Sequence, residues 1–181
     1  MFDNDWRLDA TTLTSAEQVA IKAAALQSLQ RAFRGFDVTV REGRSADRLA
    51  IVDTGYVPGL RRRGQPGPVG ETLPFARASY VHFDELFQTL LAVAGCADLA
   101  GCRKTREEMI EGLGRGIGAT AAHEIGHQTG FNFAIDAMCD ACYDGQTSKT
   151  DEHFFGSPHW SDAARERMRR VLAEREVGGS K

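Results

Sequence analysis

The sequence predicts one α+β domain with an N-terminal helix, a small mixed twisted sheet, a second long helix, and a short irregular lobe that ends in a helix. Two long segments have apolar residues at helical spacing behind threonine caps, and short segments between them alternate as strands do. With 181 residues, 42% of them hydrophobic, the chain is long enough to bury one core. We therefore expect a single domain, with an N-terminal lobe over about residues 1–130 and a C-terminal lobe over about residues 131–181.

The first half of the chain supplies a helix and the strands. Thr14 and Glu17 have the spacing of a capping box, and apolar residues follow at helical spacing until Gly35. The predicted strands are 36–40, 49–52 and 76–83. Residues 54–74 are rich in Gly and Pro, which predicts a long loop, and a helix is expected over residues 84–94.

The second half carries the other long helix and the last one. Thr105 and Glu108 form a second capping box, and the helix is expected to run through His127 and to end at Gly130. Four glycines lie inside it, at positions 112, 114, 116 and 118. They cost helix stability, which predicts either a break or a close approach of neighbouring backbone. Ser161 is expected to cap the last helix.

Charge and hydropathy exclude some classes of function. The net charge is −3, and the only dense basic run, Arg61-Arg62-Arg63, lies among Gly and Pro residues. Nucleic-acid binding is not expected, because it needs a basic face. No run approaches the roughly 20 apolar residues that cross a bilayer, and the first residues are acidic where a signal peptide is basic. We expect a monomer without a membrane partner, either cytoplasmic or a mature secreted form.

The four cysteines fall in two close pairs, Cys96 with Cys102 and Cys139 with Cys142. This count is compatible with disulfides, with a second zinc site or with reduced thiols. A thiol redox module built on the second pair is less favoured, because no predicted strand leads directly into a helix there.

A zinc site is predicted near the end of the long helix by the segment His123-Glu124-Ile125-Gly126-His127. Side chains four apart project from one face of a helix, so both imidazoles can bind one ion. Glu124 would stand beside the metal, where its carboxylate could take a proton from zinc-bound water. The pattern predicts a zinc-dependent peptidase with Glu124 as general base and a peptide or protein as substrate.

With Gly130 added, the segment resembles the metzincin zinc signature, His-Glu-x-x-His-x-x-Gly. Over residues 14–140 the order of elements is similar to the N-terminal lobe of matrix-metalloproteinase-like enzymes. The resemblance implies a zincin-like fold, in which residues 78–84 look like the substrate-binding edge strand of the sheet and a substrate peptide lies extended along the strand near residues 76–83. It also implies a methionine turn beneath the metal, for which Met138 is the candidate, an ordinary core methionine being the alternative.

The third zinc ligand is missing from its expected position, because Phe133 stands six residues after His127. The candidates for this ligand are His159, Asp136 and His153. Glu166 would serve as in thermolysin-like enzymes, but Arg170 stands where that pattern has Asp. His82 is interpreted as a core or substrate-lobe residue. The alternative function is a catalytically inactive zinc-binding protein of zincin fold that binds a peptide or protein partner.

Overall fold

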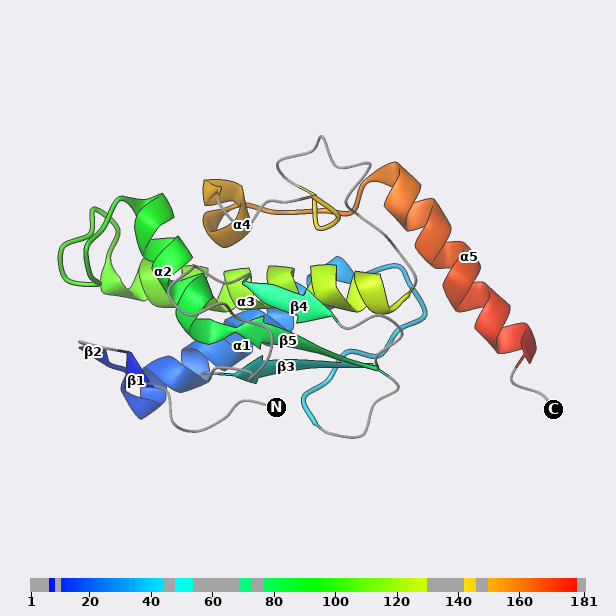
Figure 1. Cartoon of the computed structure of the whole chain (residues 1–181), viewed down its shortest axis with the longest axis horizontal. Helices are drawn as coiled ribbons and strands as arrows, with labels where there is room; N and C mark the ends of the chain where they lie inside the picture. The colour runs from blue at the N-terminus through cyan, green and yellow to red at the C-terminus, as the bar shows by residue number, and fades with distance from the viewer. Residues whose placement is uncertain are drawn as a thin grey trace.

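Two long helices form the centre of the fold. The computed structural model describes residues 7–8, 11–43, 48–53, 69–72, 77–129, 142–145 and 150–178. Helix α1 (Ser15–Ala32) packs along helix α3 (Arg106–Gln128), as Figure 1 shows. Each begins with the predicted capping box, in which a threonine hydroxyl accepts from the backbone N–H of the glutamate three residues on. Both long helices are therefore confirmed.

The glycines of α3 let neighbouring elements approach the helix and do not break it. A Cβ at Gly114 would lie 2.6 Å from the Ile21 carbonyl oxygen of α1. On another face, a Cβ at Gly112 would lie 2.6 Å from the Phe155 ring. A second glycine lies one turn further along each of these faces. The glycines lower the helix propensity of α3, and the close packing that they allow on two sides of the helix offsets this loss.

A three-stranded mixed sheet packs against α3. Its strands are β3 (Leu49–Asp53), β4 (Gly70–Thr72) and β5 (Ala78–His82). Their order is β3-β5-β4, with β5 parallel to β3 and antiparallel to β4. The expectation that residues 78–84 form the edge strand is therefore wrong, since β5 lies in the middle. The strand beside it at the edge is β4, which falls within the predicted loop 54–74 and corrects that prediction.

The strand predicted at residues 36–40 is wrong. Phe36 donates its backbone N–H to the Phe33 carbonyl at 3.1 Å, and Val38 donates to the Phe36 carbonyl at 2.9 Å, so the chain turns here. Phe36 and Val40 pack against the buried residues at the end of α1, whereas Val38 is 37% exposed. The alternation of apolar and polar residues over 36–40 therefore arises because the apolar side chains of a turn cover the end of α1, and not from a strand.

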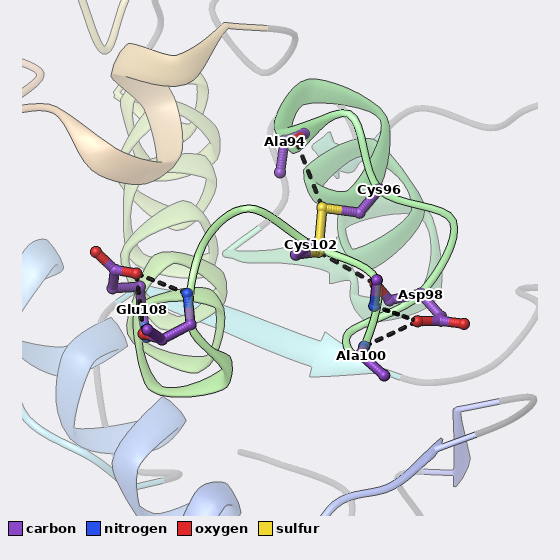
Figure 2. The surroundings of a disulfide bond; sticks show 8 residues. Ala94, Cys96, Asp98, Ala100, Cys102 and Glu108 are labelled. Atoms are coloured by element: carbon purple, nitrogen blue, oxygen red, sulfur yellow. Dashed lines mark hydrogen bonds between the residues drawn. A yellow bond between two sulfur atoms is a disulfide. The ribbon is translucent and has the colours of Figure 1, made fainter.

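Helix α2 (Phe83–Ala94) follows β5 directly and ends at Gly95, whose φ of 67° lies in the left-handed region. The loop from α2 to α3 is closed by a disulfide between Cys96 and Cys102, drawn in Figure 2. Within it, the Asp98 carboxylate accepts two backbone N–H groups, each at 2.8 Å. The disulfide and this turn fix the start of α3.

The cysteine prediction is decided for three of the four residues. Cys96 and Cys102 are bonded to each other, and Cys142 is also disulfide-bonded. A second zinc site and reduced thiols are therefore wrong for these positions. Cys139 lies outside the described residues.

The C-terminal part carries a short helix, α4 (Asp151–Phe155), and the predicted last helix, α5 (Asp162–Gly178). The sequence did not predict α4. Ser161 caps α5 as expected, because its hydroxyl accepts from the Ala164 N–H at 3.2 Å. The buried Trp160 donates its indole N–H to the Ala32 carbonyl at 2.7 Å, which satisfies a carbonyl at the end of α1.

A two-residue pair, β1 (Arg7–Leu8) with β2 (Thr11–Thr12), completes the described elements. Within the described ranges, no helix has the length and apolar character to traverse a bilayer.

Candidate metal centre

His123 and His127 bring their imidazoles together near the C-terminal end of α3. Their Nε2 atoms are 3.0 Å apart, and the ring planes meet at 85°. Two zinc–nitrogen bonds of about 2.0–2.1 Å at a tetrahedral angle hold their nitrogens about 3.3 Å apart. The pair would have to open by only about 0.3 Å to bind one zinc ion. Both residues are half-buried, so the pair remains accessible from solvent.

The Tyr143 backbone carbonyl determines which nitrogen of His123 carries the proton. His123 Nδ1 lies 2.6 Å from Tyr143 O, and since a carbonyl can only accept, Nδ1 is the donor. Burial lowers the pKa of His123 to about 4, so the ring is neutral at pH 7 and its Nε2 presents a lone pair. His127 then donates its Nε2–H to that lone pair. A carbonyl on the far nitrogen is also the partner that orients metal-binding histidines.

The segment that carries Tyr143 is held by the start of α5. The Tyr143 N–H donates to the His159 carbonyl at 2.7 Å, and its ring centroid lies 5.2 Å from that of Trp160. The next residue, Asp144, is buried and accepts from the Ser161 N–H at 2.9 Å and from its hydroxyl at 2.5 Å. The carbonyl that orients His123 is therefore fixed by packing and hydrogen bonds from residues distant in sequence.

Glu124 is turned toward strand β4 and is only 6% exposed. Its carboxylate Oε2 accepts a short hydrogen bond from the Thr72 hydroxyl. Burial raises the pKa of Glu124, while the Thr72 hydrogen bond and the nearby His127 oppose this rise. A carboxyl group with a raised pKa that interacts electrostatically with His127 is suited to accept and release a proton.

The other predicted site residues lie elsewhere. His153 is buried with its Nε2 3.0 Å from a threonine hydroxyl of α3, and the exposed His159 has its Nε2 3.7 Å from Cys142 Sγ. Asp136 and Met138 lie outside the described residues. Across the ranges that the structure describes, no three His, Cys, Asp or Glu side chains gather so as to hold a metal ion.

Two further side chains considered from the sequence have other neighbours. Glu166 on α5 pairs with Arg170 one turn along, at 3.0 Å. His82 is buried, with its Nε2 3.5 Å from Glu71 Oε2 on β4. The interpretation of His82 as a core or substrate-lobe residue agrees with this burial.

Sequence reasoning missed three contributors to the site: Gly70, where a Cβ would lie 2.6 Å from Oε1 of Glu124, Thr72 and Tyr143. The first two fall in the segment predicted as a loop, where nothing indicated that a strand would lie against the helix. Tyr143 contributes a backbone oxygen, which no pattern of side chains reveals. The cap at Ser161 was the one available signal that a defined turn precedes α5.

Comparison of the chain with protein-family models, curated proteins and solved structures finds no match. The chemistry of the site therefore depends on its own geometry. Two converging imidazoles, one of them oriented by a carbonyl, fit a zinc ion as two of its ligands. A catalytic zinc needs a third protein ligand, which has to come from a residue outside this pair.

Proposed function

We propose that this chain is a zinc-dependent peptidase in which His123 and His127 hold the ion and Glu124 is the general base. The observation that carries the proposal is the 3.0 Å approach of the two Nε2 atoms, with the Nδ1 of His123 engaged by the Tyr143 carbonyl. We include in the proposal a zincin-like, metzincin-related fold. It is supported by a long helix that bears the motif beside a small mixed sheet.

The chemistry divides between the ion and the chain. A bound zinc ion supplies Lewis acidity, which activates water and polarises a peptide carbonyl. Glu124 would take the proton of the attacking water and pass it to the departing amine. Burial raises the pKa of Glu124, which favours holding that proton between the two transfers. The half-buried histidines remain partly exposed to solvent, as a site that binds a substrate must be.

For the third ligand we propose His159 first, with Asp136 and His153 as the alternatives. The backbone of His159 is already bonded to Tyr143, whose carbonyl contacts His123, and its side chain is exposed, with its Nε2 3.7 Å from Cys142 Sγ. His153 would have to leave a fully enclosed position and abandon its hydrogen bond to α3. Asp136 follows the motif closely in the sequence.

A second candidate is a catalytically inactive zinc-binding protein that holds a peptide or protein partner in the same place. It is favoured by Phe133, which occupies the position where the metzincin resemblance expects a ligand. With two ligands only, a zinc ion would be held weakly and would keep more of its own water molecules.

Metal analysis and peptide hydrolysis test the proposal together. We expect one zinc per chain in the wild type and cleavage of an unfolded protein substrate that a chelator abolishes. Glu124→Gln should keep the zinc and lose activity by about 100-fold or more. The matched control is Glu111→Gln, an exposed residue of the same helix that pairs with Arg115 and should change neither property.

The outcomes separate the two candidates. Bound zinc without cleavage would favour the inactive protein, and a wild type that binds no zinc would refute both. Zinc analysis of His159→Ala, Asp136→Ala and His153→Ala then identifies the third ligand as the position whose change alone releases the ion.

A further inference from the structure

A chain of polar side chains runs from the end of α3 across two strands and back to Glu124. Gln128 Nε2 lies 2.5 Å from Ser79 Oγ on β5, and Ser79 Oγ lies 2.8 Å from Thr72 Oγ1 on β4. The Thr72 hydroxyl also reaches Oε2 of Glu124. Figure 1 shows β4 and β5 lying along α3, which is how the chain closes on the helix from which it starts.

The direction of these hydrogen bonds follows from the number of protons on each group. An amide nitrogen can only donate, so Gln128 donates to Ser79. A carboxylate can only accept, so Thr72 donates its single hydroxyl proton to the carboxylate of Glu124. Thr72 Oγ1 is then left as an acceptor for the hydroxyl of Ser79, which also lies 3.2 Å from the backbone carbonyl of Glu124. The last bond, from Thr72 to the carboxylate, is strengthened by the charge of its acceptor.

Strand β4 also leaves space for the carboxylate. A Cβ at Gly70 would lie 2.6 Å from Oε1 of Glu124 and 2.7 Å from Thr120 Cγ2. Any side chain at position 70 would push the Glu124 side chain out of its present place. Thr72 therefore holds one carboxylate oxygen, and the bare backbone of Gly70 accommodates the other.

We infer that Thr72, supported by Ser79 and given room by Gly70, is the positioning residue that holds the Glu124 carboxylate in the orientation needed for proton transfer. This inference rests on the proposed function for its catalytic consequence, and on the geometry alone for its structural one. The hydrogen bonds of Thr72 go to Ser79 and Glu124, so it acts through Glu124. Its removal is therefore expected to affect turnover and not zinc binding.

The test compares Thr72→Val, which keeps the shape and removes the hydroxyl, with Thr72→Ser, which keeps the hydroxyl. We expect Thr72→Val to lower kcat by roughly tenfold or more, as the loss of a hydrogen bond to a charged group does, with KM and zinc content unchanged. Thr72→Ser should restore kcat to within about threefold of the wild type. Thr89→Val makes the same change in a hydroxyl that bonds only within α2, at 2.7 Å from the Glu85 carbonyl, and should have no effect on kcat.

Crystal structures of the metal-free variants give a readout that needs no activity. In Thr72→Val and in Gly70→Ala, we expect the Glu124 carboxylate to leave β4, and in Thr72→Ser to stay. A carboxylate that keeps its position in Thr72→Val, or a serine variant as impaired as the valine one, would overturn the inference. If no wild-type peptidase activity exists, the proposed function fails, and the crystal structures still decide whether Thr72 positions Glu124.

Discussion

Acidification from pH 7 to pH 5 is expected to destabilise the metal-free protein through His153. This residue of α4 is 4% exposed, and its Nε2 lies 3.0 Å from the Thr120 hydroxyl. Burial lowers its pKa to about 4, against 6.5 for an exposed histidine. Between these two values the unfolded chain binds a proton that the folded chain does not. Stability therefore falls as the pH drops from 6.5 toward 4, and this loss is complete below pH 4.

The size of the effect follows from the two pKa values. The full difference corresponds to roughly 3 kcal/mol of unfolding free energy. At pH 7 an exposed histidine is mostly neutral, so the loss is only about 0.2 kcal/mol. At pH 5 the unfolded state is almost fully protonated at this position, and the loss reaches roughly 2 kcal/mol. Nearly all of that change therefore falls between pH 7 and pH 5.

Urea unfolding of the wild type and His153→Gln at the two pH values measures this contribution. Gln does not titrate and can still bond to the Thr120 hydroxyl, so the variant should lose roughly 2 kcal/mol less than the wild type on acidification. His123, whose pKa burial also lowers to about 4, titrates in both proteins and cancels in the comparison. Equal losses in the two proteins would refute the assignment of this pH dependence to His153.

Three further predictions concern the packing of α1 against α3, the disulfide before α3, and the ion pair between Glu17 and Arg106. Gly118→Ala should lower the free energy of unfolding, measured by calorimetry, by about 1–3 kcal/mol, because the new Cβ would lie 2.6 Å from Ser28 Cβ on α1. Gly101→Ala, whose Cβ would have its nearest atom at 3.5 Å, should lower it by under about 0.5 kcal/mol. Similar costs in both would contradict the close contact. Replacing Cys96 and Cys102 by Ser should remove roughly 2 kcal/mol in guanidinium unfolding, as expected for so short a loop, and an unchanged midpoint would argue against the disulfide. Glu17→Gln should cost about 1 kcal/mol at pH 7, an amount reduced by the 40% exposure of its partner Arg106. The Arg106 hydrogen bond lowers the pKa of Glu17 to about 2, so this contribution should disappear as the pH falls from 4.5 to 2, and a pH-independent cost would exclude the ion pair as its origin.

The elements that could be predicted are those whose signals are local. The two capping boxes and the periodic apolar residues behind them define α1 and α3 within one or two residues. The strand expected at 36–40 fails because alternation does not specify a pairing partner, and here the segment covers a helix end. Strand β4 was not predicted, since its three residues stand in a Gly- and Pro-rich stretch of sequence and are too few to show alternation, although they pair with the nearby β5.

The same distinction applies to the candidate site. The histidine pair could be predicted because a spacing of four residues on a helix is enough to place both rings on one face. The partner of His123 could not, since the Tyr143 carbonyl arrives from beyond the helix and depends on the turn that precedes α5. The glycines of α3 suggested a possible break, and only the packing of α1 and α4 against them explains the continuous helix.

The spacing of the motif also requires two separate supports for the site. Glu124 is one residue beyond His123, which turns it about 100° around the helix axis and away from the histidine face. A single neighbouring element therefore cannot hold both groups. In this chain the segment at Tyr143 orients the histidine, and strand β4 holds the carboxylate through Thr72. Changes near α5 should consequently weaken zinc binding, whereas changes in β4 should slow turnover at constant zinc content. A variant of β4 that released zinc, with the histidine pair intact, would show that the two supports are not independent.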